Sequence, residues 1–466
     1  MTFKSKKSQL TIILAVFFCS FQLFSQNDED VLMVQKIHDE ALRSNVAYDW
    51  LKDLTVKFPG RIAGSQAYRD AATHMLEVLN TIPSVTSRFQ SCEADYWKRG
   101  NDDNVYMTDT NEKLLKLDAT ALGNSGSTAN EGIFAEVVEV QELDEVDELG
   151  FEGISGKIVF FNRPMDPTKP RTFSAYGGAV DQRVYGPARA AKYGAAGALV
   201  RSMTLSIDDV PHTGVTVFPD TLTPIPALGV STKSCELLSR AIKERTVSIF
   251  LQCSSEQLGK KSAPTVIGEI KGSEKSDDII LVGGHLDSWD ISPGAHDDGA
   301  GCVQAMDVLR ILMKLNYKPK RTIRCVLFSN EENGLAGGKT YAKAAKEQSE
   351  FHLAAIEADS GGFSPQGFSF DAEADVFSNY YTSVSKWSSV LEPYGLYFTK
   401  GGTGADISPL KDQKGLLVGL RTDSQRYFDF HHTSIDNIHA VHPRELALGA
   451  AAMASLVYLI DKYGLE

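Results

Sequence analysis

The residues with the clearest chemical potential lie between 281 and 301, in the run LVGGHLDSWDISPGAHDDGAG. An apolar run ends at two glycines, and the next fourteen residues include His285, Asp287, His296, Asp297 and Asp298. Carboxylates and imidazoles crowded in this way need a compensating charge, and a metal ion is the simplest one. Aspartate and glycine are also common in surface turns, so this run alone leaves a metal site and an ordinary loop equally open.

Three further polar clusters follow apolar runs later in the chain. They are Glu331-Glu332 after IRCVLFS, Asp359 after AAIEA, and His431-His432 in the loop FDFHHTSIDNI. Each cluster taken singly is better explained as a helix start, a turn or a loop. Four clusters at the C-terminal ends of predicted strands are much harder to explain in that way, because open α/β sheets bind ligands at that edge. The sequence therefore predicts one composite site.

The charges of this composite site favour two metal ions. The carboxylates of Asp297, Glu332 and Asp359, together with one hydroxide, neutralise two divalent cations. A single cation with the same ligands would leave excess negative charge in a cleft, at a cost of several kcal/mol. Mixed histidine and carboxylate ligands favour zinc over calcium or magnesium. We therefore expect two Zn²⁺ ions per chain.

The elements that hold these clusters are predicted within residues 263–466. Strands are expected at 277–284, 323–328, 354–358 and 416–420, and helices at 301–315 and 443–463. Alternating β and α units of this kind predict an α/β fold, a three-layer α/β/α domain with a mostly parallel central sheet. Residues 26–110 are expected to belong to the same domain and to contribute helices over 30–57 and 65–79, the second capped by Ser65.

Residues 111–262 have a different texture and predict a small inserted α/β domain. Short strands alternate with Gly- and Pro-rich turns at 133–140, 157–161, 198–200 and 247–251, with one helix at 187–193. The block ends in the polar, linker-like SSEQLGKKS. Arg201 and the turn at 211–214 (PHTG) are its most noticeable polar groups, and we expect both to have structural roles.

The N-terminus predicts export. Residues 1–25 combine Lys4, Lys6 and Lys7 with an apolar stretch from Leu10 to Phe24, which is typical of a secretory signal peptide. The stretch is short for a membrane span and nothing later replaces it, so we expect a secreted or periplasmic protein without a transmembrane segment after cleavage. Cys19 leaves a lipid anchor open.

Charge and cysteine content narrow the function further. The net charge is −13, and removal of the three signal-peptide lysines, with no acid beside them, makes it −16. Such a chain is a poor candidate for binding nucleic acid or an anionic membrane. The five remaining cysteines form no CxxC, so we expect no cysteine metal ligands, whereas one disulfide between Cys235 and Cys253 is allowed.

Five motifs, GGHLDSWD, GAHDDGAG, SNEENG, EADSGG and HHTSID, occur here in the order seen in peptidase family M28, the dinuclear zinc aminopeptidases and related exopeptidases, which the catalytic part resembles. Residues 111–262 resemble the protease-associated (PA) domain that several members carry as an insertion. PGRIAGS is similar to the family's N-terminal motif. The softer features GAHDDGAG, PHTG, GGTGADISP and FDFHHT are most similar to its plasma glutamate carboxypeptidase (carboxypeptidase Q) branch.

The resemblance implies roles for single residues. Five of them would be metal ligands, with Asp297 shared by both zinc ions, His285 and Asp359 completing one site, and Glu332 and His432 the other. Glu331 would be the general base that activates the attacking water, and Asp287 would fix the tautomer of His285 from behind. The family also implies a cis peptide bond after the bridging aspartate, here Asp297-Asp298.

Only one residue of the pair His431-His432 is expected to be a metal ligand. Neighbouring residues of an extended loop point to opposite sides, so only one ring is expected to reach the cation. The family's ligand lies four residues before an aspartate, and His432 with Asp436 has that spacing. His431 would then pack against the aromatic run Tyr427 to Phe430 or contact substrate. Asp406 in GGTGAD is our candidate for binding a free α-amine, with a plain loop aspartate as the alternative.

These expectations describe a metallo-exopeptidase that hydrolyses dipeptides or short peptides with a free N-terminus; a homodimer is compatible with them. Two alternatives are a glutaminyl cyclase-like acyltransferase with a single zinc ion and a receptor-like relative without catalysis. The insertion and the second histidine argue against the first, and the complete set of ligands and base argues against the second.

Overall fold

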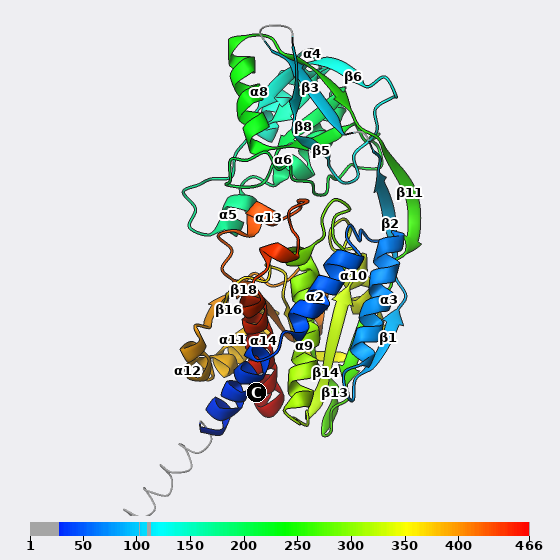
Figure 1. Ribbon diagram of the computed structural model, residues 1–466. Helices are drawn as coiled ribbons and strands as arrows, with labels where there is room; N and C mark the ends of the chain where they lie inside the picture. Colours follow the sequence, from blue (N-terminus) through cyan, green and yellow to red (C-terminus); the bar gives the residue numbers. More distant parts are fainter. Residues whose placement is uncertain (1–27, 102, 110–112, 466) are drawn as a thin grey trace, which may run out of the picture.

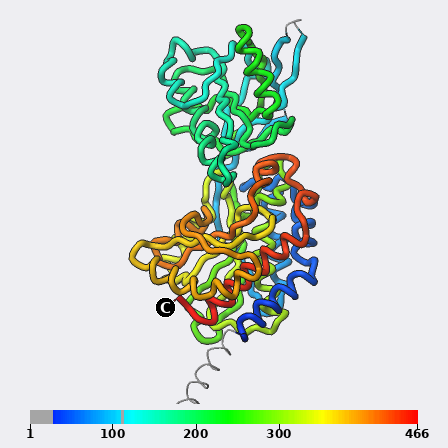
Figure 2. Tube along the Cα trace, turned by 90° about the vertical axis from the view of Figure 1, so that its left-hand side faces the viewer, coloured from blue at the N-terminus to red at the C-terminus, as the bar shows by residue number. Residues whose placement is uncertain are grey.

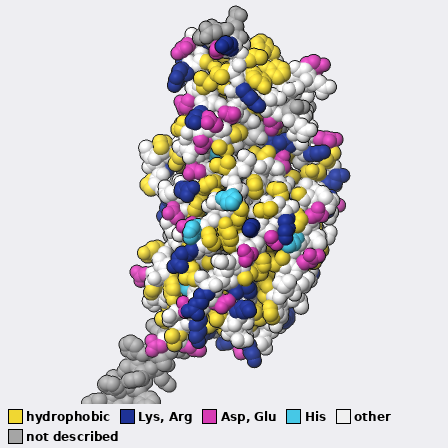
Figure 3. All heavy atoms as spheres, in the orientation of Figure 1, with side chains coloured by type: hydrophobic (Ala, Val, Ile, Leu, Met, Phe, Trp, Pro, Cys, Tyr) yellow, Lys and Arg dark blue, Asp and Glu magenta, His cyan; other side chains and the backbone are white. Residues whose placement is uncertain are grey.

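The computed structural model describes residues 28–465 except 102 and 110–112. Figure 1 shows two lobes, a larger main domain that contains the C-terminus and a smaller insert above it, and Figure 2 shows the same division from the side. The signal peptide and Cys19 lie outside the described residues. On the face drawn in Figure 3, basic and acidic side chains are interspersed over both lobes.

The main domain is built on an eight-stranded sheet. The order across the sheet is β1 (Thr86–Gln90), β12 (Thr265–Ile270), β14 (Arg321–Phe328), β13 (Lys275–His285), β15 (Phe351–Glu357), β18 (Leu416–Thr422), β16 (Pro365–Asp371) and β17 (Tyr397–Lys400). The four central strands β14, β13, β15 and β18 are parallel, whereas β1, β12 and β16 join antiparallel. Parallel centres of this kind are buried on both faces.

Alternating residues of the central strands enter two separate cores. Ile280 and Val282 of β13 pack with α2 (Val46–Lys57), α3 (Gln66–Asn80), α9 (Ala300–Lys314) and α14 (Pro443–Tyr463). Leu281 packs on the other face with Tyr341 of α10 (Ala336–Glu347). The period of two in a strand therefore produces the predicted three layers. α14 has the length and hydropathy of a membrane span, but 83% of its apolar window is buried as a core helix.

The insert is organised around a second eight-stranded sheet. Its order is β4 (Leu114–Leu117), β3 (Asn104–Thr108), β10 (Ser248–Gln252), β6 (Ile133–Val140), β7 (Ile158–Phe161), β8 (Gly197–Arg201), β9 (Ala227–Val230) and β5 (Ala119–Ala121). Its helices are α4 (Leu143–Ile154), α5 (Thr172–Gly177), α6 (Asp181–Val184), α7 (Gly186–Lys192) and α8 (Thr232–Glu244). Because β3 already belongs to this sheet, the insert begins before residue 111, the expected boundary.

A two-stranded ribbon joins the lobes, and it corrects one prediction. SSEQLGKKS is not an irregular linker: it connects the lobes as strand β11 (Ser255–Ser262), which pairs antiparallel with β2 (Glu93–Arg99). Its polar composition reflects exposure, because most of its side chains face solvent while its backbone pairs with β2, whose Trp97 is buried. Figure 1 shows the ribbon at the side of the molecule as the connection between the two lobes.

Most predicted elements occur within a few residues of their expected bounds, and Ser65 caps α3 by accepting from the amide of Tyr68 at 3.0 Å. The helix expected over 30–57 is instead broken, with helical residues 28–42 followed by α2 and Asn45 at the break. The disulfide between Cys235 and Cys253 is not formed: both thiols are free, buried and directed at backbone carbonyls of Val230 and Gly126.

Candidate metal centre

The predicted clusters converge because their strands are neighbours. β13, β14 and β15 are adjacent parallel strands. β13 ends at His285, β14 ends shortly before Glu331-Glu332, and β15 ends shortly before Asp359. The C-terminal ends of adjacent parallel strands lie side by side, so side chains far apart in sequence meet at one edge. His431 and His432 reach the same edge from the end of the short helix α13 (Tyr427–Phe430), after β18.

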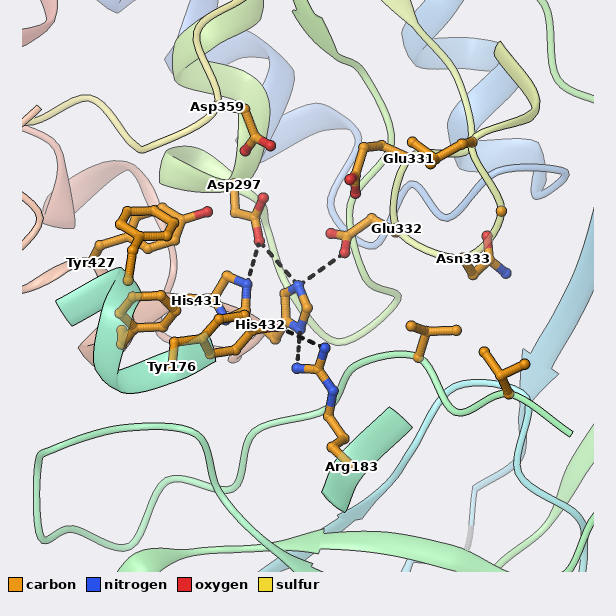
Figure 4. A pocket seen from close by; sticks show the side chains of 16 residues that line it. Tyr176, Arg183, Asp297, Glu331, Glu332, Asn333, Asp359, Tyr427, His431 and His432 are labelled. Atoms are coloured by element: carbon orange, nitrogen blue, oxygen red, sulfur yellow. Dashed lines mark hydrogen bonds and ion pairs between the residues drawn. The ribbon is translucent and has the colours of Figure 1, made fainter. Parts of the chain in front are cut away.

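Asp297 lies at the centre, and its two oxygens face different partners. Oδ1 is 3.2 Å from Nε2 of His285, which is in turn 3.8 Å from Oδ1 of Asp359. Oδ2 is 3.3 Å from Nε2 of His432, which is 3.0 Å from Oε2 of Glu332. Figure 4 shows Asp297 between these two sets of side chains. Asp297 therefore lies between the two sets of side chains that the sequence predicted as metal ligands.

The backbone around Asp297 is held in an unusual local structure. It lies in a π-helical turn, η1 (Ala295–Gly299), and the Asp297-Asp298 peptide bond is cis, as the family resemblance implied. Asp436 fixes this turn, because its carboxylate accepts from the amides of His296 at 2.8 Å and Asp297 at 3.1 Å. His296 is not part of the centre, since its ring stacks on Phe363 at 4.0 Å.

Asp298 has a structural task instead. Its carboxylate accepts from the amide of His285 at 3.0 Å and from the amide of Gly301 at 3.0 Å. It therefore ties the end of β13 to the first turn of α9, and both of its oxygens already have hydrogen-bond donors. Geometry alone groups it with His285 and Asp359 as a candidate ligand set. The two oxygens of Asp297 are the better placed for cations, because Oδ2 is buried without a hydrogen-bond donor.

Asp287 acts differently from the sequence prediction. Nδ1 of His285 is 3.0 Å from the backbone carbonyl of Asp287 but 3.8 Å from its carboxylate, so the carbonyl fixes the tautomer. The carboxylate instead accepts from the amides of Glu331 at 3.2 Å and Glu332 at 3.3 Å. Asp287 therefore positions both glutamates at once, and it does so from a fully buried site.

The PGRIAGS segment explains how the loop after β13 is held. Arg61 is completely buried and donates to the carbonyls of Leu286 at 2.6 Å, Pro293 at 2.5 Å and Gly294 at 2.8 Å. A guanidinium that satisfies three buried carbonyls keeps irregular backbone from losing its hydrogen bonds. The preceding Gly60 has φ +64°, and a Cβ there would lie 2.3 Å from the carbonyl oxygen of Asp290.

The expectation that His431 and His432 point to opposite sides is wrong. Their rings stack with centroids 3.5 Å apart and 20° between planes, and both Nε2 atoms face Oδ2 of Asp297, at 3.7 Å for His431 and 3.3 Å for His432. His432 has φ +62°, so the loop is not extended there and both rings project the same way. His431 also contacts the rings of Tyr427 and Phe428, as predicted.

Asp406 does not reach the cavity. Its side chain is 1% exposed, and neither carboxylate oxygen has a hydrogen-bond partner among the described residues. Its backbone is held by Glu357, whose carboxylate accepts from the amides of Asp406 at 3.4 Å and Ile407 at 2.9 Å. Burial and the charge of Glu357 raise the pKa of Asp406 well above its ordinary value. In this structure it cannot meet the α-amine of a substrate.

The insert reaches His432 through Arg183, which the sequence did not indicate, and through the PHTG turn, for which a structural role was expected. Arg183 lies with Nη1 3.3 Å from Nδ1 of His432, and its Nη2 donates to the hydroxyl of Tyr176 at 2.8 Å. In the PHTG turn, Thr213 donates its amide to the carbonyl of His432 at 3.0 Å, and its own carbonyl is 3.3 Å from Nδ1 of His432. Arg201, in contrast, pairs with Asn162 and Glu236 inside the insert, which is the structural role expected.

Together the two lobes enclose a cavity of about 420 Å³. Rings of the two lobes touch at its side, because Phe173 of α5 stacks on Tyr427 of α13 at 5.3 Å, and Figure 1 shows these two short helices together. The lining consists of Phe173, Tyr176, Arg183, Val215, Val217, Asp297, Glu331, Glu332, Asn333, Gly334, Leu335, Asp359, Tyr427, Phe428, His431 and His432. In Figure 4 Glu331 projects from its loop into this space.

The electrostatics of the site differ between its two predicted histidine ligands. Although burial opposes it, hydrogen bonds to Asp297 and Asp359 raise the pKa of His285 well above its ordinary value. Burial raises the pKa of Glu331 to about 8, with Asp359 and Asp297 adding to the effect against the opposing charge of His285. Burial, reinforced by Asp297, raises the pKa of Glu332 well above its ordinary value. Burial and the adjacent ring of His431 hold the pKa of His432 far below the usual range. A neutral imidazole has a lone pair free for a cation, as ligation requires.

Comparisons with known proteins agree with this geometry. Residues 265–457 match the sequence profile described as Peptidase family M28. Carboxypeptidase Q of Rattus norvegicus is 31% identical over 421 residues, which cover 89% of this chain and 85% of the relative. Carboxypeptidase Q of Homo sapiens is 30% identical over 423 residues, with the same coverage of 89% and 85%.

Solved structures show the same fold over both lobes. The crystal structure of a peptidase M28 precursor from Shewanella amazonensis SB2B superposes with a TM-score of 0.88 at 31% identity, over 94% of this chain and 99% of that one. A zinc aminopeptidase from Bacillus subtilis shares the fold at a TM-score of 0.61 and 18% identity, over 88% of this chain and 94% of that one. The chain belongs to peptidase family M28 and is a metallo-exopeptidase.

Proposed function

We propose that this protein is a dinuclear zinc exopeptidase that hydrolyses dipeptides or short peptides with a free N-terminus. The observation that carries the proposal is the position of Asp297, one oxygen facing His285 and Asp359 and the other facing His432 and Glu332. These five residues would hold two Zn²⁺ ions, with Asp297 as the shared ligand.

The residues fit that pair of cations. Oδ2 of Asp297 is buried without a hydrogen bond, which is costly unless a positive charge meets it. The imidazole of His432 is neutral, and the carbonyl of Asp287 leaves Nε2 of His285 free to face Asp297. Asp287 and Asp436 hold the backbone of three of the acidic residues, and such outer contacts orient ligands around a metal.

Glu331 is the proposed general base. Bound zinc would polarise the scissile carbonyl and make the attacking water more acidic. Glu331 projects into the cavity and accepts a proton from that water at its carboxylate, then delivers it to the nitrogen of the leaving amine. Its neighbour Glu332 faces His432 instead, at 3.0 Å, so the two glutamates take different tasks.

Arg183 suggests how the carboxyl end of a short substrate is recognised. When Nε2 of His432 faces a metal, Nδ1 keeps the proton and donates to the carbonyl of Thr213, so Nη1 of Arg183 has no acceptor there. Nε of Arg183 also lacks a partner, the residue is 5% exposed, and no carboxylate among the described residues pairs with it. A buried, unpaired guanidinium in a substrate cavity fits a peptide carboxylate.

The same chemistry applies to the amino end. With Asp406 buried, the acidic lining of the cavity is left to attract the α-amine, and the side chain of Asp359, which is 23% exposed, is a candidate. A site that pairs both termini within about 420 Å³ favours dipeptides over long chains. Export through the predicted signal peptide would place this activity outside the cytoplasm. The homodimer and the PA-like identity of the insert stay predictions.

The test is a library of dipeptides and tripeptides incubated with purified mature protein, with products identified by mass spectrometry. We expect release of the N-terminal residue, loss of activity on chelation and recovery with Zn²⁺. Acetylated N-termini should block hydrolysis. Cyclisation of N-terminal glutamine without hydrolysis would favour the one-zinc acyltransferase, and full activity after complete metal removal would refute the proposal.

A further inference from the structure

A second cavity of about 360 Å³ lies beside the first, between the insert and the edge of the main sheet. Phe173 lines both cavities, and Ser360, which lines the second, follows Asp359, which lines the first. In Figure 1 β16 and β18 of the main domain lie below α5 of the insert. The two cavities therefore adjoin, with Phe173 as a wall of both.

The lining of this second cavity is basic. It contains Arg171, Phe173, Ser174, Ser360, Gln366, Phe368, Tyr397, Thr399, Arg421, Thr422 and Ser424, and hence two guanidinium groups and no carboxylate. Over the described part of the chain, neither guanidinium has a hydrogen bond or an ion pair. In a chain with 60 acidic and 47 basic residues this is a notable imbalance. Arg324, farther along the same sheet, pairs with both Glu269 and Glu350.

The backbone makes room for one of these cations. Gly402 has φ +71°, and a Cβ there would lie 2.6 Å from Nη2 of Arg421. Any other residue at 402 would displace the guanidinium. Arg421 is also half-buried, and burial together with the charge of Arg171 lowers its pKa. The two cations destabilise each other, and an anion between them would relieve that repulsion.

We propose that the cavity lined by Arg171 and Arg421 is a subsite for a carboxylate of the peptide substrate. Guanidinium groups bind carboxylates through paired hydrogen bonds, and two of them select an anion over a neutral amide of the same shape. The carboxylate comes from an acidic side chain or from the C-terminus of a peptide longer than the catalytic cavity holds. This subsite rests on the proposed peptidase function and adds to it a preference for peptides that place a carboxylate in the second cavity.

The test compares isosteric substrate pairs in matched variants. One pair exchanges Glu for Gln as a dipeptide side chain, and the other exchanges a C-terminal carboxylate for an amide in a tripeptide. Arg421→Gln and Arg171→Gln remove one cation each from the cavity. Arg426→Gln is the control, because it removes the same charge from a residue that lies over the Phe430 ring and lines a different cavity.

We expect Arg421→Gln to lower the acid-to-amide ratio of kcat/KM about tenfold for at least one pair, with a smaller change in Arg171→Gln and none in Arg426→Gln. A change confined to the Glu/Gln pair identifies the side chain as the source, and a change confined to the acid/amide pair identifies the C-terminus. Ratios that shift no more than in Arg426→Gln overturn the subsite.

Direct binding separates this inference from the proposed function. Calorimetry on Glu331→Gln protein measures the dissociation constants of the same four peptides without turnover. Acid-selective binding that depends on Arg421, with no hydrolysis of these peptides by the wild-type enzyme, would keep the subsite and refute the proposed hydrolysis of short peptides. Hydrolysis by the wild type together with equal binding of acid and amide in all variants would keep the proposed function and refute the subsite.

Discussion

The two lobes contribute to the candidate centre in different ways. The floor of the site consists of His285, Glu331, Glu332 and Asp359 at the ends of parallel strands and of Asp297 in the turn η1, and backbone hydrogen bonds hold it. The roof comes from short helices and a turn of the insert and meets the floor at His432. Under the proposed function, the floor carries the chemistry, whereas the roof orients His432 and selects the substrate.

The largest expected effect concerns the residue at which floor and roof meet. His432→Ala should remove one zinc ion and nearly all activity, a loss above about 10³-fold, because His432 is the imidazole that faces both Asp297 and Glu332. His431→Ala should keep two zinc ions, because its Nε2 is 3.7 Å from Oδ2 of Asp297 and its ring is packed among aromatic residues. Zinc content by mass spectrometry decides the matter. One zinc in the His431 variant and two in the His432 variant would exchange the roles.

The adjacent glutamates of the floor give the next contrast. Glu331→Gln should retain both zinc ions and bind substrate while lowering kcat by about 10²-fold or more, the scale of a lost general base. Glu332→Gln should instead lose zinc, because its carboxylate faces His432. Metal content and steady-state kinetics are measured for both variants, and each variant is the control for the other. If Glu331→Gln lost zinc and Glu332→Gln kept it, the two roles would be exchanged.

A substitution at Asp287 tests whether the floor depends on the hydrogen bonds that hold Glu331 and Glu332. Asp287→Asn keeps the carbonyl that contacts His285 but replaces one acceptor oxygen with an amide that cannot accept from Glu331 or Glu332. We expect zinc content to be unchanged and kcat to fall about 10- to 100-fold. Loss of zinc in this variant would show that the hydrogen bonds of the Asp287 carboxylate to Glu331 and Glu332 are required for metal binding as well as for turnover.

The roof gives the smallest and most selective effect. Arg183→Met should raise KM about tenfold for dipeptides with a free carboxylate and leave C-terminal amides nearly unaffected, because only the carboxylate uses the guanidinium. Both zinc ions should stay bound. An equal loss for acids and amides would mean that Arg183 serves His432 alone.

The sequence predicted the floor because its signals are local. Apolar runs that end in His285, Glu331-Glu332 and Asp359 identify strand ends, and the parallel alternation brings such ends together. The roof has no comparable signal. Arg183 lies in a short helix between ordinary residues, and its importance follows only from the way the insert folds over the main domain.

The other differences between the predictions and the structure also depend on tertiary contacts. The opposite-sides expectation for His431 and His432 assumed an extended loop, but the positive φ of His432 is a tertiary feature. Asp406 has a loop composition that suggests exposure, yet Glu357 holds its backbone beneath the site. The polar SSEQLGKKS becomes a strand because β2 is available as a partner.

The central claim is that Asp297 holds two metal ions, one on each oxygen. Anomalous diffraction at the zinc absorption edge, on crystals of the zinc-loaded protein, measures this directly. We predict two peaks about 3.5 to 4 Å apart, one near His285 and Asp359 and the other near Glu332 and His432, with the carboxylate of Asp297 between them. A single peak, or two peaks that do not share Asp297, would contradict the account.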